Sequence, residues 1–190
     1  MNDRDWRQSL FVFWEDGYDF FGRRNQRLDC FHSNRCRTGV FHPLFHCRTV
    51  SGGRTVNAPT LQSAERLVVN KFIYRFRPPE RGEILVFRYP RDPSRDFIKR
   101  VIAVPGDTIE IRDGRVYVNA ALLNEPYILS KTRGNYPLAT VPDGHIFVMG
   151  DNRNNSEDSR FADVGFVPFD LIKGKAMLVF WPVSQFKTLP

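Results

Sequence analysis

A polar loop follows an apolar run toward the C-terminal end of the chain. The run is HIFVM, residues 145–149, and the loop is GDNRNNSEDSR, residues 150–160, with two Asp, two Arg, three Asn and two Ser. Asp and Asn side chains stabilise turns by bonding backbone amides, and Asp158 can pair with Arg160. Polar loops at the ends of rigid strands also carry binding and catalytic groups. Composition alone leaves the structural and the functional interpretation open.

Lys99 is the second candidate for chemistry, because it interrupts the apolar run FIKRVIAV, residues 97–104. Side chains alternate between the two faces of a strand, so Lys99 and Arg100 point in opposite directions and one of them faces the interior. A lysine removed from water has a lowered pKa because its charged form loses hydration. Its neutral amine can then deprotonate a hydroxyl, as a general base does. The alternative is a lysine on an edge strand, exposed to solvent.

The cysteines and histidines do not predict a metal site. Three cysteines, Cys30, Cys36 and Cys47, are an odd number, so a disulfide framework is not expected. His42 and His46 have a plausible ligand spacing, but the spacing of the first two cysteines does not match that of zinc modules. We therefore expect no metal and no cofactor.

The charge balance permits two kinds of partner. The formal net charge is +7 and the pI is about 9.6, which allows attraction to nucleic acid or to an anionic membrane surface. Arg and Phe alternate through residues 72–100, a pattern that suits single-stranded nucleic acid but equally suits a solvated β face. Nucleic acid is therefore not the expected partner. No stretch reaches the roughly 18 to 20 apolar residues that a membrane span needs.

The composition changes near residue 57. Residues 1–57 contain no Lys, Ala or Ile, but they hold nine Arg, all three Cys and three of the four His. Neither the helical nor the strand period persists there, so we expect residues 1–57 to be poorly ordered. A segment translated in the wrong frame would have such a composition, and we treat a frameshift as a hypothesis. A divergent or disordered N-terminus is the alternative.

From residue 58 onward the pattern indicates strands. Alternating or β-branched runs occupy residues 66–73, 83–88, 97–104, 107–112, 115–119, 145–149 and 175–181. Asp113-Gly114 separates two of these runs, and both residues favour the positive φ that a two-residue hairpin turn requires. Turn residues lie between the runs, and no long helix is indicated. The sequence predicts an all-β domain at residues 58–190, an antiparallel sandwich or partly closed barrel.

These segments together resemble the bacterial type I signal peptidases. The loop at residues 150–160 is similar to the family's GDNRxxSxDSR box at every fixed position, and residues 99–107 look like its KRxxGxPGD box. Pro59-Thr60-Leu61 looks like the end of the SMxPTL box. The resemblance extends from Pro59 to about Pro182, some two thirds of the chain.

The resemblance implies a serine protease that uses a lysine in place of the usual histidine. In this family a serine attacks the peptide carbonyl and a buried lysine takes the serine proton. Lys99 matches that general base, and Ser156 matches the serine that orients it. The other matched residues of the polar loop brace the site: Gly150, Asp151, Asp158 and Arg160.

The chain departs from the family at the nucleophile. The serine of SMxPTL should fall at position 56, where the chain has Val56, followed by Asn57 in place of Met. Arg54 occupies the position where the family offers Ser or Gly near the oxyanion, and Ala103 replaces a usual Gly. Ser63 lies seven residues beyond Val56, too far to substitute. We therefore expect impaired activity in the chain as written.

The resemblance also implies partners and a location. The substrates would be secretory preproteins whose signal peptides end in an Ala-X-Ala-like pattern, cut at the membrane lipid surface on the extracytoplasmic side of the cell membrane. Two alternatives remain. One is a catalytically dead homologue that binds signal peptides or the membrane surface without turnover. The other is a self-cleaving serine-lysine protease of the repressor type, although no helix-turn-helix or internal Ala-Gly site is found.

Overall fold

The computed structural model describes residues 45–49, 57–62 and 64–190, and for residues 45–49 it describes the backbone alone. Most of the segment at residues 1–57 therefore lies outside the described residues. The same holds for Val56, Arg54 and Ser63 and for the expectations placed on them. The expected disorder and the frameshift hypothesis also concern residues that lie mostly outside the described ranges.

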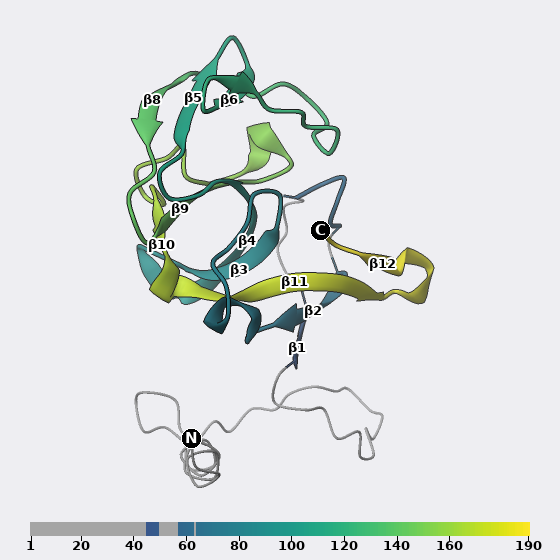
Figure 1. The fold of residues 1–190 in the computed structure, drawn as a ribbon. Helices are drawn as coiled ribbons and strands as arrows, with labels where there is room; N and C mark the ends of the chain where they lie inside the picture. The colour runs from purple at the N-terminus through teal and green to yellow at the C-terminus, as the bar shows by residue number, and fades with distance from the viewer. Residues whose placement is uncertain (1–44, 50–56, 63) are drawn as a thin grey trace, which may run out of the picture. The chain divides into compact units, whose positions relative to one another are not determined.

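The described chain is built from short strands joined by turns (Figure 1). The strands are β1 (Phe45–Thr49), β2 (Arg66–Asn70), β3 (Ile84–Tyr89), β4 (Asp92–Ala103), β5 (Thr108–Arg112), β6 (Arg115–Val118), β7 (Ala121–Leu122), β8 (Tyr136–Thr140), β9 (His145–Met149), β10 (Val167–Pro168), β11 (Ile172–Trp181) and β12 (Lys187–Thr188). Four 3₁₀ turns connect them: η1 (Ile73–Arg75), η2 (Arg153–Asn155), η3 (Phe169–Leu171) and η4 (Val183–Gln185). The described ranges contain no α-helix.

The strands form two antiparallel sheets. The larger sheet has the order β1-β2-β11-β3-β4-β9-β10, with β12 paired to β11, and the smaller has the order β7-β6-β5-β8. Figure 1 draws the smaller sheet above the larger, whose long β11 crosses the lower part of the view. The prediction of an all-β antiparallel fold is confirmed, and the two sheets are not closed into a barrel.

Alternation along the strands sorts the core into clusters on the two faces of the larger sheet. Leu85 and Phe87 pack with Val101, while Ile84 and Val86 pack with another cluster across the sheet. A third cluster fills the space between the smaller sheet and the ends of β4 and β9. Burying each such aliphatic side chain stabilises the fold by roughly 1.5–3 kcal/mol. This apolar frame holds β4 and β9 side by side.

Local polar chemistry explains where two of the predicted segments end. The run at residues 66–73 stops being a strand after Asn70, because its Oδ1 accepts the backbone N–H groups of Phe72 at 2.9 Å and Ile73 at 3.2 Å. An Asn that bonds its following amides starts a turn instead of a ladder. The Asp113-Gly114 hairpin is present as predicted, with φ of 51° and 73°.

Candidate active site

Lys99 lies inside the larger sheet. It pairs across β3 and β4 with Leu85, so alternation places its side chain on the face of Phe97 and Val101. Its side chain is buried, with 3% of its surface exposed, and Nζ lies 5.3 Å from the centre of the Phe97 ring. The sequence placed a lysine in an apolar strand, and the structure buries it.

Ser156 meets Lys99 from the polar loop. Strand β9 pairs with β4, Arg100 opposite Met149 and Val101 opposite Val148, so the loop that leaves β9 begins beside Lys99. The turn η2 then brings the chain back, and Lys99 Nζ donates a hydrogen bond of 2.8 Å to Ser156 Oγ. Both groups are buried. The two residues that the motifs selected are therefore in direct contact.

Burial lowers the pKa of Lys99 from 10.5 to about 8. Loss of hydration is the largest cause, and the nearby charge of Arg160 acts in the same direction. The carboxylates of Asp158, Glu157 and Asp151 oppose it by favouring the ammonium form. A substantial fraction of the Lys99 side chain is therefore neutral in mildly alkaline solution and can accept a proton.

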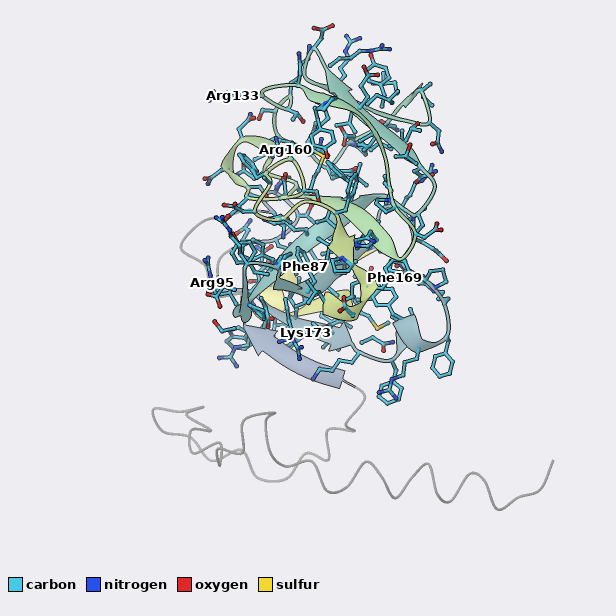
Figure 2. The ribbon with its side chains drawn as sticks, turned by 90° about the vertical axis from the view of Figure 1, so that its left-hand side faces the viewer. Phe87, Arg95, Arg133, Arg160, Phe169 and Lys173 are labelled. Atoms are coloured by element: carbon cyan, nitrogen blue, oxygen red, sulfur yellow. The ribbon has the colours of Figure 1, made fainter. Side chains whose placement is uncertain are left out.

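Asp158 is held by Arg160. Arg160 Nε donates to Asp158 Oδ1 at 2.7 Å and Nη2 donates to Oδ2 at 2.9 Å, while the backbone N–H of Gly150 reaches Oδ2 at 3.1 Å. Asp158 is fully buried, and a bidentate charged pair is the arrangement that makes such burial tolerable. The pair ties the end of the loop to its beginning and so fixes the position of Ser156. Figure 2 shows Arg160 above Phe87, which belongs to the core around β3.

A second buried ion pair lies on the opposite face of β4. Arg100 Nε donates to Asp151 Oδ1 at 2.8 Å and Nη2 to Oδ2 at 2.7 Å, and Thr60 Oγ1 also donates to Asp151. The guanidinium stacks 4.0 Å from the Tyr127 ring centre. Lys99 and Arg100 lie on opposite faces of β4, and each of these faces is covered. Both are buried, because Asp151 neutralises the arginine.

Asn57 connects the residues after position 56 to this site. Its Nδ2 donates to the backbone carbonyl of Ile98 at 2.7 Å, and its Oδ1 accepts the backbone N–H of Asp151 at 3.4 Å. Ile98 immediately precedes Lys99. The Asn57 side chain therefore links the strand that carries Lys99 to the start of the polar loop. Val56 itself is outside the described residues.

Comparison with known proteins identifies the family. Residues 38–181 match the family model described as "Signal peptidase, peptidase S26". This chain belongs to the signal peptidase I family of serine endopeptidases. It is 47% identical over 138 residues to "Probable signal peptidase I-1" of Synechocystis sp., which covers 69% of each chain.

Other signal peptidases are also similar to this chain. "Signal peptidase I" of Leptolyngbya laminosa is 44% identical over 134 residues, or 67% of this chain and 65% of the relative. The chain spans 60% of a second Synechocystis signal peptidase. A crystal structure of a signal peptidase I from Enterococcus faecalis is 32% identical, with a TM-score of 0.47, and the match covers 52% of this chain and 97% of that one.

Several contacts around the site of this signal peptidase were not predicted from its sequence. Arg153, fully buried, pairs with Glu125 and donates to Thr132 at 3.2 Å. Tyr89 donates to Glu157 at 3.0 Å, beside Ser156. Arg153 is a fixed position of the GDNR motif, which could have marked it as important. Nothing in the sequence indicated its partner, which comes from another loop.

Two features are absent from the described residues. No group of three or more His, Cys, Asp and Glu side chains there could hold a metal ion. Within the same residues, no helix has the length and apolar character needed to cross a bilayer.

Proposed function

We propose that this chain is a signal peptidase I catalytic domain whose general base is Lys99, with Ser156 as its orienting partner. The single observation that carries the proposal is the 2.8 Å contact between Lys99 Nζ and Ser156 Oγ in a buried setting. An amine with a pKa near 8 is matched to proton transfer close to neutral pH. Gly150, Asp151, Asp158 and Arg160 brace the site.

The reaction needs a serine at position 56. Neutral Lys99 takes the proton of that serine while the serine oxygen attacks the carbonyl carbon of the substrate. The lysine then gives the proton to the leaving amine as the C–N bond breaks, which leaves an ester on the serine. Lys99 next takes a proton from a water molecule, whose oxygen attacks the ester carbonyl. The lysine returns that proton to the serine oxygen as the C–O bond breaks, which releases the acid product and restores the free enzyme. An arginine could not do this, because a guanidinium does not release its proton in proteins.

The chain as written has Val56 at the nucleophile position and is therefore impaired. A valine offers no hydroxyl for attack, and removing the nucleophile of a catalytic triad costs several orders of magnitude in rate. The position of Asn57 beside Ile98 and Asp151 supports position 56 as the place for the serine.

The substrates proposed are secretory preproteins cut after an Ala-X-Ala-like end, at the membrane lipid surface on the extracytoplasmic side. The names of the relatives support the substrate kind. The net charge of +7 supports contact with an anionic lipid surface. Nucleic acid is not proposed as a partner.

Restoring the nucleophile tests the proposal. The chain carrying Val56→Ser, alone and with Asn57→Met, is assayed on a signal-peptide substrate against the unaltered chain. We expect a gain of at least about 10³-fold, which Lys99→Ala in the restored chain abolishes. No gain in either restored chain would count against both position 56 and the proposed reaction.

A dead homologue is the second candidate, and Val56 favours it. Such a protein would bind a signal peptide without cleaving it. If the unaltered chain captures an immobilised preprotein and returns it intact, and the restored chain also fails to cut it, the binding role replaces the enzymatic one.

The composition of residues 1–57 supports a frameshifted reading as the reason for the missing serine. The nucleotide sequence around codons 1–60 tests this directly. A second frame that encodes Ser-Met before Pro59 would support it. An intact reading, with these residues found in the protein by mass spectrometry, would rule it out.

A further inference from the structure

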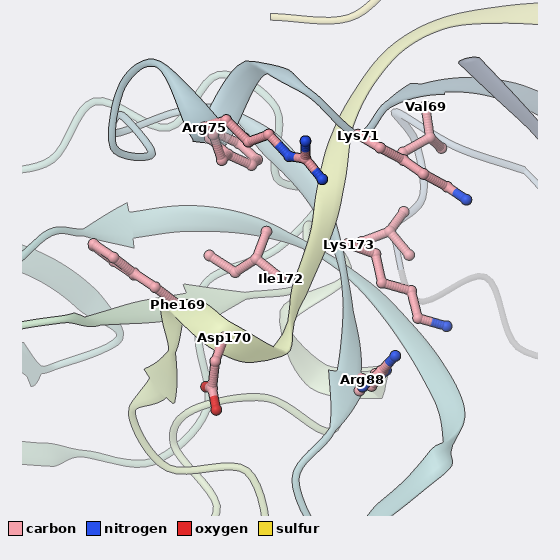
Figure 3. Close-up of a pocket in the computed structure, with 10 residues that line it drawn as sticks. Val69, Lys71, Arg75, Arg88, Phe169, Asp170, Ile172 and Lys173 are labelled. Carbon is pink, nitrogen blue, oxygen red and sulfur yellow. The ribbon is translucent and has the colours of Figure 1, made fainter. Parts of the chain in front are cut away.

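A basic hollow opens on the larger sheet, near η1, β3 and β11 (Figure 3). Its volume is about 590 Å³. Its charged lining consists of four cations and one acid: Lys71, Arg75, Arg88, Lys173 and Asp170. Apolar side chains, including Val69, Val86 and Ile172, complete the lining. The hollow therefore has apolar side chains in its lining, and most of its charged side chains are positive.

The hollow is separate from the Lys99–Ser156 contact. Arg88 follows Val86 by two residues on β3, so both point to the face opposite Leu85, the residue that pairs with Lys99. Although Tyr74, Phe169 and Ile172 of the lining pack against the cluster of Leu85, neither Lys99 nor Ser156 lines the hollow. A ligand in the hollow would not touch the amine of Lys99.

Two of the four cations have defined side-chain contacts. Lys173 donates to Asp96 at 3.0 Å, and the Arg75 guanidinium stacks 4.5 Å from the ring centre of Phe72. Arg88 is exposed and makes no ion pair with another described residue. In the view of Figure 3, Lys71, Arg88 and Lys173 lie on one side of the β11 ribbon and Asp170 on the other. Asp170 thus lies apart from three of the four cations, although Asp96 pairs with one of them, Lys173.

We propose that this hollow binds a phosphate-class anion, the group shared by a phospholipid headgroup and free phosphate. Arginine and lysine are the usual partners of phosphate, and four of them line this hollow. Phe76 follows Arg75 directly and is 83% exposed, so an apolar surface adjoins the cations. A lipid offers both a phosphate and apolar chains, and this favours the headgroup as the source.

This site goes beyond the proposed catalytic function. A headgroup bound here would supply a location for the membrane contact, yet binding needs neither a peptide nor a nucleophile. A binding assay without peptide therefore fails or succeeds independently of the peptidase test.

The test uses the full chain and the variant Lys71→Gln/Arg88→Gln. Both replaced residues are exposed, and melting curves confirm that the variant folds. Arg115→Gln/Arg133→Gln, which removes two exposed cations elsewhere, is the matched control. Binding is measured by co-sedimentation with vesicles of phosphatidylcholine containing phosphatidylglycerol, and with pure phosphatidylcholine vesicles. In a second arm, inorganic phosphate is added and the shift in melting temperature is recorded.

A lipid source predicts binding to the anionic vesicles that the double variant weakens by roughly tenfold to thirtyfold, while the control stays within about twofold. A free-phosphate source predicts a melting shift in the unaltered chain that the double variant loses. Asp170→Asn should strengthen binding in either arm, since it removes the acid from the lining. Equal behaviour of the double variant and the control in both arms overturns the proposal. A DNA duplex that binds through these residues when vesicles and phosphate do not would also overturn it.

Discussion

Lys99 Nζ and Ser156 Oγ lie 2.8 Å apart although 57 residues separate them along the chain. The antiparallel pairing of β4 with β9 brings them together, and the Asp158–Arg160 pair holds the loop in place. Neither group is on the surface. The contact is thus a consequence of the fold, and the chemical properties of Lys99 follow from its burial.

Replacing Lys99 by an apolar residue of similar length should stabilise the protein below pH 8. The folded-state pKa of about 8 lies below the ordinary 10.5, so between these values the unfolded chain binds more protons and stability rises with pH. In Lys99→Met this dependence disappears. The variant's free energy of unfolding at pH 7 should be higher by about 2–3 kcal/mol, allowing for the lost hydrogen bond to Ser156. Urea unfolding from pH 7 to pH 10 measures the difference, which should shrink as pH rises. A difference that grows with pH would contradict the assignment.

The charge of Asp158 should set the pH dependence of the restored enzyme. In the chain with Val56→Ser, kcat/KM should rise with pH to a midpoint near 8 as Lys99 loses its proton. Asp158→Asn removes a charge that raises the pKa of Lys99, so the midpoint should move to lower pH. Because the change also leaves Arg160 without its carboxylate partner, the free energy of unfolding should fall by about 3–5 kcal/mol. Asp143→Asn, an exposed acid, is the control that should leave the midpoint unchanged.

Removing the Ser156 hydroxyl should slow the restored enzyme without unfolding it. The hydroxyl makes one hydrogen bond to Lys99, and losing a bond of this kind costs about 1 kcal/mol, or roughly a fivefold lower kcat. Substrate binding does not depend on that bond, so KM should change little. Ser184→Ala removes an exposed hydroxyl and should leave both constants unaltered. An equal loss in both variants would argue against an orienting role for Ser156.

Gly174 should tolerate no side chain, because β2 passes close to it. A Cβ built at Gly174 would collide with the backbone carbonyl of Asn70. Gly174→Ala should therefore lower the free energy of unfolding by about 1–3 kcal/mol. Gly134 also has a positive φ, of 78°, but a Cβ there would meet no atom within 4 Å. Gly134→Ala therefore measures only the free-energy cost of placing a non-glycine residue at positive φ. Chemical denaturation of both variants should show the larger loss at Gly174.

The sequence predicted the strands well, because strands depend on local patterns. Alternating apolar residues located β3, β5 and β6, and the Asp113-Gly114 turn was recognisable from two residues. Lys99 and Ser156 were selected by their motifs, and the fold brings them into contact. The polar start of β4, Asp92-Pro93-Ser94, was not predicted as strand. Its residues favour turns: Asp92 Oδ1 accepts the Ser94 N–H at 3.2 Å, and of the three only Asp92 has a partner in the register with β3, Tyr89.

Long-range polar partners could not be predicted in the same way. The burial of Arg100 depends on Asp151, and that of Arg153 on Glu125. A buried arginine and a solvated arginine look alike in a sequence, because only the folded chain reveals which carboxylate lies opposite. The basic hollow has the same origin, since its cations come from residues spread between Lys71 and Lys173.

Direct titration of the Lys99 amine tests the account most simply, because it requires neither a substrate nor a restored nucleophile. The Nζ resonance is followed by nuclear magnetic resonance in protein labelled with ¹⁵N-lysine, and Lys99→Met identifies it by its absence. The buried Lys99 amine should titrate with a midpoint near pH 8, well below the midpoints of exposed lysines. A midpoint near the ordinary 10.5 would show a hydrated ammonium, and Lys99 could not then be the base.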